Sequence, residues 1–406
     1  MTARRVVVTG LGVICALGHN LAEVWCALRA GRSGIGPIRS LDVSNLRFQN
    51  GAEVREYDTG KHFGSNRADL LDRFAQFAVI AAREAVGDSG VTLTPELREK
   101  TAVVSGSCVG GQSTQDAGFV ELYRQERGRV HPLTIPRIMA NAGASHISVE
   151  FGTTGPAFTI STACSSANHA IGQAFRMVRS GEVDLAIAGG SEAPFSMGLL
   201  KAWEAIRVIA PDTCRPFSRD RRGMILGEGG AMLVLEPLER AEARGARIYG
   251  EIVGLGMSSD AGHITQPSVE GPARAMRAAL RDAQLHPEQV GYINAHGTGT
   301  PGNDPTETRA IREVFGAHAD RLAVSSTKSM HGHALGAAGA LEAVATVMAL
   351  HQGLLPPTAN FIEPDPECDL DIITHRARAA QVECALSNSF AFGGLNAVLA
   401  LRTHLR

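Results

Sequence analysis

Residues 162–175 are Thr162-Ala163-Cys164-Ser165-Ser166-Ala167-Asn168-His169-Ala170-Ile171-Gly172-Gln173-Ala174-Phe175. The residues before them, 156–160, are short, apolar and β-branched, which predicts a buried strand that enters a tight turn. After them, small and apolar side chains recur at helical spacing as far as Val178, and Gly181 is a typical helix stop. We therefore expect Cys164 at a strand-to-helix turn, where unpaired N–H groups and the helix dipole favour the nucleophilic thiolate. The alternative for any single cysteine is a small buried side chain that only packs.

Length and composition limit the function classes. A chain of 406 residues is long for one domain, and we expect two core-bearing halves, residues 1–247 and 248–406. A net charge of −2 with 20% charged residues gives no global basic field, which argues against nucleic acid as a partner. Seven scattered cysteines without metal spacing indicate a reducing compartment, so we expect a cytoplasmic protein without a required metal. No signal peptide precedes the first strand, and Glu342 interrupts the longest apolar run, which predicts a buried helix and no membrane span.

Apolar strands alternate with helical patterns along both halves, which predicts an α/β fold with buried, largely parallel sheets covered by helices. Expected helices include 66–87, 271–283, 304–315 and 334–351. In each half an apolar strand ends in Ser and Thr and turns into a small-residue helix, at 160–164 and again at 324–328, which indicates an internal duplication. Gly10 and Gly12 imitate a dinucleotide fingerprint, but Cys15 replaces the third glycine and no acidic strand end follows, so an NAD-binding dehydrogenase is the least favoured alternative.

Three downstream stretches bring polar groups to strand ends. His296 lies in a Gly- and Thr-rich loop, where it is either a functional or a capping residue. Lys328, His331 and His333 precede an apolar helix, and three ionisable groups in one turn favour a buried site over a snorkelling lysine. Residues 387–396 place aromatics among glycines, which suits either core packing or a backbone that approaches a ligand. The pair Asp304 and Glu307 carries no chemistry on spacing alone.

Taken together, these motifs resemble the β-ketoacyl-acyl carrier protein synthase II family in their order and spacing, from Arg4 to Arg402. The resemblance also includes residues 214–218 and 226–229. It implies a thiolase-like fold in which two duplicated α/β halves form a layered αβαβα sandwich, usually as a homodimer with the active site between the halves. It implies no cofactor, since the phosphopantetheine arm arrives on the acyl carrier protein.

The family reaction is a decarboxylative Claisen condensation. By resemblance, Cys164 accepts the acyl group from an acyl carrier protein, and malonyl-acyl carrier protein then loses CO₂ and attacks that thioester. His296 and His333 would donate hydrogen bonds to the developing enolate, and the backbone N–H groups of Cys164 and Phe392 would hold the tetrahedral intermediate. Lys328 would orient His333, with Glu307 in support.

Other residues take substrate-binding roles by resemblance. Thr298 and Thr300 would hold the phosphopantetheine arm, Phe392 would gate the acyl pocket, and Val109 and Trp203 would line it. Three arginines are candidates for docking the acidic carrier protein: Arg127, Arg129 and Arg207. Four residues match a structural cation site of some relatives: Asn294, Glu342, Ser387 and Asn388.

The sequence also departs from the housekeeping pattern of this family. Ala391 precedes the gate where glycine is usual, Leu395 replaces a threonine, and His331 stands at a usual threonine position. Trp203 and Val109 replace a phenylalanine and an isoleucine. With residues 201–214, these features look closer to nodulation-type synthases of polyunsaturated chains and to type II polyene polyketide ketosynthases, which pair with a chain-length factor. A degradative thiolase and a non-catalytic chain-length subunit are less favoured, since the first needs a second cysteine and the second generally lacks the nucleophile.

Overall fold

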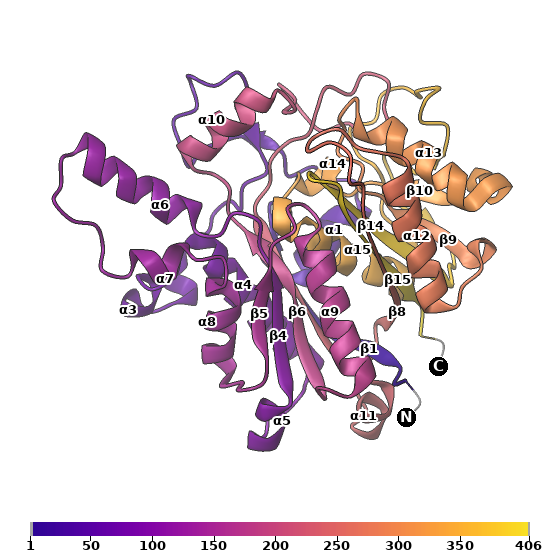
Figure 1. Ribbon diagram of the computed structural model, residues 1–406, viewed down its shortest axis with the longest axis horizontal. Helices are drawn as coiled ribbons and strands as arrows, with labels where there is room; N and C mark the ends of the chain where they lie inside the picture. The colour runs from indigo at the N-terminus through magenta and orange to yellow at the C-terminus, as the bar shows by residue number, and fades with distance from the viewer. Residues whose placement is uncertain (1–2, 405–406) are drawn as a thin grey trace.

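The computed structural model describes residues 3–404; residues 1, 2, 405 and 406, at the outer ends of the two expected halves, lie outside the described part. The main sheet runs β5-β4-β6-β7-β1 and then β8-β15-β14-β9-β10-β12 (Figure 1). The first set is β1 (Val6–Cys15), β4 (Thr101–Gly106), β5 (Ala157–Ile160), β6 (Leu185–Glu192) and β7 (Gly229–Pro237). The second is β8 (Gly250–Ser259), β9 (Val290–Asn294), β10 (Ala323–Ser325), β12 (Asp371–Ile372), β14 (Cys384–Ala391) and β15 (Leu395–Arg402).

The two sets of strands repeat one topology. With β12 set aside, each set has five strands: the first pairs antiparallel with the fifth, the fifth pairs antiparallel with the fourth, and the fourth, second and third are parallel. Counted within each set, the order is therefore 3-2-4-5-1 in both, and β12 adds an edge to the second. An antiparallel pairing of Val6–Val8 with residues 250–252 joins them. The duplication expected from residues 160–164 and 324–328 is confirmed.

Helices separate the strands into layers. The outer face of the first set carries α4 (Arg73–Ser89) and α8 (Ala142–Phe151), and that of the second carries α12 (Glu270–Ala283) and α13 (Asn303–Phe315). Between the two sets lie α9 (Ser166–Ser180) and α15 (Ala338–Gln352), which contact strands of both (Figure 1). Their apolar side chains share one core with both sets of strands. The layered α/β architecture predicted from the sequence is confirmed, but the sheet is mixed where largely parallel strands were expected, since β1, β7, β8 and β15 pair antiparallel with one another.

The remaining elements are short. The helical ones are α1 (Leu21–Arg29), α2 (Thr59–His62), α3 (Ser65–Ala68), α5 (Pro95–Glu99), α6 (Gln112–Phe119), η1 (Val120–Arg124), α7 (Thr134–Ile138), α10 (Met197–Ile206), α11 (Leu238–Ala243), η2 (Pro287–Gln289), η3 (Gly316–Arg321), α14 (Lys328–His331) and η4 (Leu335–Ala337). Two-residue strands form the pairs β2 (Gly36–Pro37) with β3 (Asn50–Gly51) and β11 (Leu354–Leu355) with β13 (Arg378–Ala379). The segment from α6 to α7 projects from the body as an arm, at the left of Figure 1.

Two sequence expectations change in detail. Gly10 and Gly12 belong to β1, where a Cβ would come within 2.1 and 2.0 Å of carbonyl oxygens of α4, so the glycines serve close helix packing. The helix expected over 66–87 instead begins at Arg73, because the buried Asp72 caps it by accepting from the Phe74 N–H. Within residues 3–404, no helix is long and apolar enough to cross a membrane.

Candidate active site

Cys164 lies where β5 passes into α9, as the sequence predicted. Ala163 before it adopts a left-handed φ of +50°, an unusual conformation for a residue with a side chain. The Ser166 hydroxyl holds this turn, since it accepts from the Thr162 N–H at 2.9 Å and donates to the Ala163 carbonyl at 2.6 Å. The Cys164 side chain is buried, with 7% of its surface exposed. The turn therefore aims one sulfur atom into the interior at a helix N-terminus.

The backbone N–H groups at this turn act on the pKa of the Cys164 thiol in the expected direction, but burial has the larger effect. Burial raises the pKa of the Cys164 thiol to about 11, although Lys328 and the backbone N–H groups of Phe392 and of Cys164 itself lower it. Desolvation thus outweighs the helix terminus, and the resting sulfur carries a proton. The same two N–H groups were expected to form an oxyanion hole, and each of them lowers the pKa of the Cys164 thiol.

His296 follows β9, and its backbone is held by Glu307 of α13. The two carboxylate oxygens of Glu307 accept from the N–H groups of His296 and Gly297, each at 2.8 Å. The amide of Asn388 also donates to Glu307, at 3.2 Å. Glu307 is fully enclosed, and burial raises its pKa. It therefore positions the His296 loop.

His333 follows α14 on a segment pinned to residues 225–227. Its N–H donates to the Ile225 carbonyl at 2.6 Å, and its carbonyl accepts from the Gly227 N–H at 2.9 Å. The rings of His296 and His333 meet edge to face, with centroids 5.5 Å apart. Both rings are buried, and burial together with the charge of Lys328 holds both pKa values well below the usual range. Both imidazoles are therefore neutral.

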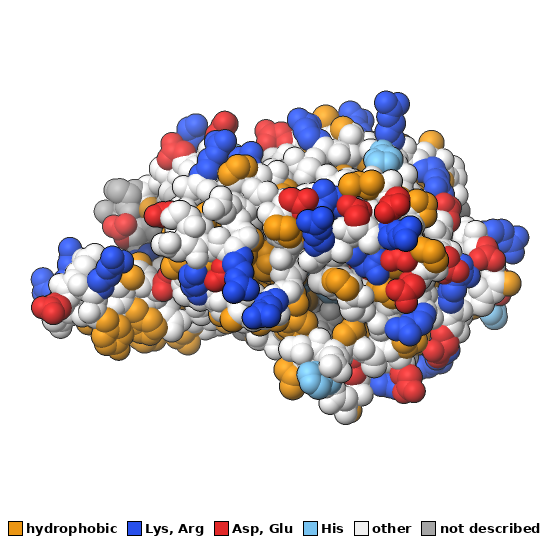
Figure 2. All heavy atoms as spheres, turned by 90° about the horizontal axis from the view of Figure 1, so that it is seen from above, with side chains coloured by type: hydrophobic (Ala, Val, Ile, Leu, Met, Phe, Trp, Pro, Cys, Tyr) orange, Lys and Arg blue, Asp and Glu red, His pale blue; other side chains and the backbone are white. Residues whose placement is uncertain are grey.

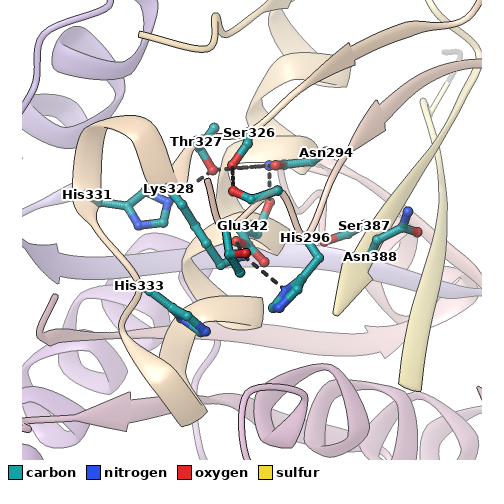
Figure 3. Close-up of polar contacts among 12 residues, drawn as sticks. Asn294, His296, Ser326, Thr327, Lys328, His331, His333, Glu342, Ser387 and Asn388 are labelled. Carbon is teal, nitrogen blue, oxygen red and sulfur yellow. Dashed lines mark hydrogen bonds and ion pairs between the residues drawn. The ribbon is translucent and has the colours of Figure 1, made fainter. Parts of the chain in front are cut away.

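The hydrogen-bond partner of each neutral histidine shows which ring nitrogen carries the proton. Lys328 Nζ lies 3.3 Å from Nδ1 of His296, and an ammonium group can only donate (Figure 3). The Leu335 N–H donates to Nδ1 of His333 at 3.2 Å. Nδ1 of each ring is thus an acceptor, which leaves an Nε2–H donor on each. The site presents two neutral hydrogen-bond donors side by side.

Lys328 is fully buried and forms an ion pair with Glu342 of α15 (Figure 3). Burial raises the pKa of the Glu342 carboxyl and the lysine lowers it. By resemblance Lys328 was expected to orient His333, whereas its hydrogen bond goes to His296. Its pairing with Glu342 was not predicted, although a single glutamate within an apolar helix indicates a buried partner.

A cavity of about 230 Å³ brings these groups together. Cys164, His296 and His333 line it, with Thr298 and Thr300 and with Trp203 and Phe392. The two threonine hydroxyls lie 2.9 Å apart. Phe392 stacks on Trp203 with ring centroids 6.0 Å apart, so the predicted gate closes against a predicted pocket residue. Val109 does not line this cavity; its N–H donates to Glu192 at 3.3 Å.

The three arginines expected at the docking surface lie in two places. Arg207 lines the cavity, together with Arg222, which the sequence analysis missed. Arg127 and Arg129 are exposed between η1 and α7 on the projecting arm, and Arg127 pairs with Glu121 at 3.6 Å. Figure 2 looks onto the end of the molecule that carries α10 and the arm, and basic side chains are spread over it. Of the three, only Arg207 lies at the cavity.

The residues expected at a cation site lie on β9, β14 and α15. Asn294 lies opposite Ser387, and its amide donates to the Glu342 carbonyl at 3.3 Å. Three buried oxygens have no hydrogen-bond partner among the described residues: Glu342 Oε2, Ser387 Oγ and Asn388 Oδ1. Ser387 and Asn388 are consecutive in β14, so their side chains leave opposite faces of the strand, and the Asn388 amide bonds Glu307 and Met276 of the outer helices. The four residues therefore stay a predicted cation site, which an oxygen-preferring cation would suit. No cluster of three His, Cys, Asp or Glu side chains suited to a metal occurs in residues 3–404.

Two family models match the chain: Beta-ketoacyl synthase, N-terminal domain, over residues 3–241, and Beta-ketoacyl synthase, C-terminal domain, over residues 249–362. Nodulation protein E of Rhizobium sp. (strain N33) is 48% identical over 402 residues, which cover 98% of this chain and 99% of the relative. The 3-oxoacyl-[acyl-carrier-protein] synthase 2 of Synechocystis sp. (strain ATCC 27184 / PCC 6803 / Kazusa) is 44% identical over 409 residues, covering 99% and 98%. The solved ishigamide ketosynthase/chain length factor superposes with a TM-score of 0.94 at 40% identity and covers 100% of both chains.

Proposed function

The chain belongs to the β-ketoacyl synthase family, and we propose that Cys164, His296, Lys328 and His333 carry out its Claisen condensation. One observation supports this assignment above the others. A single buried cavity is lined by one cysteine and by two neutral histidines whose tautomers are set to donate. A nucleophile beside two fixed donors suits a reaction that passes through a thioester and an enolate.

The first half-reaction is acyl transfer. The Cys164 sulfur attacks the thioester carbonyl of an acyl-acyl carrier protein, the new carbon–sulfur bond forms, and the carrier thiol leaves with the proton of Cys164. The oxyanion of the tetrahedral intermediate would lie against the backbone N–H groups of Cys164 and Phe392, both of which lower the pKa of the Cys164 thiol. Phe392 must turn away from Trp203 to admit the acyl chain.

The second half-reaction is decarboxylative condensation. The bond between the malonyl carboxylate and its α-carbon breaks, CO₂ leaves, and the electron pair remains as a thioester enolate. The Nε2–H groups of His296 and His333 would bind the enolate oxygen. Loss of one such donor typically costs about 10²- to 10³-fold in rate. The α-carbon then attacks the Cys164 thioester, and the sulfur leaves to give a 3-oxoacyl product two carbons longer.

We propose an acyl carrier protein as the partner and its phosphopantetheine arm as the only prosthetic group in the reaction. The paired hydroxyls of Thr298 and Thr300 at the cavity suit the amides of such an arm, and Arg207 suits an acidic partner. We place the enzyme in the cytoplasm, where its seven cysteines would stay reduced.

We also propose a dimer formed through the arm and β5. β5 is an edge strand of the main sheet. The arm exposes several large apolar side chains, with Tyr123 78% and Ile135 63% exposed, and hydrophobic side chains gather on it in Figure 2. The partner is either a second copy or, in a specialised pathway, a chain-length factor. Light scattering of the purified chain distinguishes the homodimer from the heterodimer, since a chain that pairs only with a chain-length factor is a monomer when purified alone.

A second candidate is a ketosynthase of a specialised polyunsaturated or polyene pathway. Its support is the 48% identity to a nodulation protein and the 40% identity to the ishigamide ketosynthase/chain length factor. Trp203 stacks on the gate residue Phe392, and its indole ring is larger than the phenylalanine side chain common at this position in the family.

Intact-mass spectrometry tests both candidates. The wild type and Cys164→Ala are incubated with saturated and 2,4-unsaturated acyl-acyl carrier proteins, and malonyl-acyl carrier protein is then added. Loading of saturated chains by the wild type alone, with release of the two-carbon-longer 3-oxo product, supports ordinary elongation. Loading of unsaturated chains only supports the specialised pathway. Failure of every donor to acylate Cys164 would overturn the proposed function.

A further inference from the structure

Glu192, the last residue of β6, is a buried carboxylate that the proposed reaction does not use. Its side chain is fully enclosed. Its oxygens accept four hydrogen bonds, two on each atom. Oε1 accepts from the Ser107 hydroxyl at 3.1 Å and from the Val109 N–H at 3.3 Å, and Oε2 accepts from the N–H groups of Cys108 at 2.6 Å and Gly336 at 3.0 Å. No ion pair between Glu192 and a basic side chain occurs in residues 3–404.

These four donors come from two loops far apart in the sequence. Residues 107–109 follow β4 in the first half, and Gly336 follows His333 in the second. The loops approach so closely that a Cβ on Gly336 would lie 2.4 Å from the Cys108 nitrogen and 2.6 Å from Glu192 Oε2. Each unpaired buried N–H would cost about 1–3 kcal/mol, so the carboxylate is what allows the two loops to meet.

The turn that Glu192 binds also determines which nitrogen of the His333 ring carries the proton. Leu335 adopts a left-handed φ of +45°, and its N–H donates to Nδ1 of His333. The next N–H, that of Gly336, is bound by Glu192. The backbone of His333 is fixed separately through Ile225 and Gly227. The Ala337 N–H closes this turn on the Ala334 carbonyl at 2.9 Å, and Glu192 fixes the Gly336 N–H within it. Together they set the direction of the Leu335 N–H, and with it the tautomer of the ring.

We propose that Glu192 is a positioning residue that keeps His333 as the Nε2–H tautomer by anchoring the Leu335–Gly336 turn. The inference rests on the proposed function, in which that Nε2–H binds the enolate. Acyl transfer to Cys164 does not require this donor, whereas condensation does. Disturbing Glu192 should therefore slow the second half-reaction and leave the first nearly unchanged.

The test separates the two half-reactions in Glu192→Asp, which keeps the carboxyl group but withdraws it by one methylene. Acylation of Cys164 by acyl-acyl carrier protein, followed by intact mass, is expected to stay within about threefold of the wild type. Condensation of the pre-acylated enzyme with malonyl-acyl carrier protein is expected to fall about 10- to 100-fold, the range for a small misplacement of a reacting group. NMR of ¹⁵N-histidine-labelled enzyme, with the signals assigned through His333→Ala, should show His333 moving from the Nε2–H form to a tautomer mixture.

Two further variants keep the proposal falsifiable. Glu192→Gln keeps the side-chain length but offers one acceptor oxygen to four donors. We expect it to slow condensation less than Glu192→Asp does, and it serves as the test if the aspartate variant does not fold. Glu236→Gln is the matched control, because Glu236 of β7 is also buried but bonds Thr9 of β1 and Arg244 after α11, away from the cavity. Equal losses in both half-reactions with an unchanged tautomer would overturn the positioning role, and so would unchanged condensation in both Glu192 variants. A wild type that does not acylate Cys164 would overturn the proposed function itself.

Discussion

His331, one turn after Lys328, gives a sharp prediction of how stability depends on pH. Nδ1 lies 2.8 Å from the Gly332 carbonyl and must donate to it, and Nε2 lies 3.0 Å from the Thr327 hydroxyl, from which the neutral ring accepts. Burial, followed by the charge of Lys328, lowers the pKa of His331 from 6.5 to about 3.

The magnitude follows from linkage. In the unfolded chain the ring takes up a proton below pH 6.5, whereas in the folded protein it resists protonation down to about pH 3. A depressed pKa contributes stability that is present above pH 6.5 and lost as the pH falls towards 3. Between pH 7.5 and 5.0 this loss amounts to about 2 kcal/mol, since each pH unit below 6.5 costs about 1.4 kcal/mol.

The test compares urea unfolding of the wild type and His331→Thr at pH 7.5 and 5.0. Threonine does not titrate, so the variant should lose about 2 kcal/mol less than the wild type between the two pH values, whatever its stability at pH 7.5. Ser329→Ala on the same helix is the control, because it removes a buried hydroxyl without removing a titrating group. If the wild type and His331→Thr lose stability in parallel, the neutral, doubly bonded His331 is refuted.

Three further outcomes are expected. Lys328→Met should cost about 3–5 kcal/mol of stability by leaving Glu342 unpaired, and Lys328→Met with Glu342→Gln should recover most of it in urea unfolding without restoring condensation. Alkylation of Cys164 by iodoacetamide should rise with pH towards a midpoint near 11, and Lys328→Met should move that midpoint higher; a midpoint below 9 would contradict the burial argument. Trp203→Ala should release Phe392 and raise the loading of longer acyl chains by about two- to tenfold, the worth of one aromatic pair, whereas an unchanged chain-length profile would show that this stack does not limit the pocket.

Local patterns were enough to predict the turn at Cys164, because a β-branched strand and a small-residue helix on either side of Thr162–Ser166 leave few other conformations. They also predicted that the two halves repeat. The apolar periodicity placed the start of α4 too early, because it did not weigh the local cap at Asp72, which accepts from the Phe74 N–H and also binds Thr114. The pairing of Val6–Val8 with residues 250–252 was invisible, because a register between distant strands has no local signal.

The site shows the same division between local and long-range causes. The helix terminus at Cys164 is local, and it predicted a thiolate. The burial that raises the pKa of this thiol, like the added effect of the Glu342 charge, depends on segments far away in the sequence, which the local pattern does not reveal. The histidines were recognisable from their motifs, but the motifs do not say which nitrogen carries the proton.

The proton assignments depend on two different kinds of partner, and this has a consequence for the reaction. His296 receives its hydrogen bond from a charged side chain, Lys328, whereas His333 receives its own from the backbone of Leu335. A side-chain donor can be removed by one substitution, but a backbone donor can only be misdirected. The first ring is therefore sensitive to the charge of its neighbour and the second to the shape of its turn. For this reason a carboxylate with no basic partner, Glu192, matters at His333, while an ion pair serves at His296.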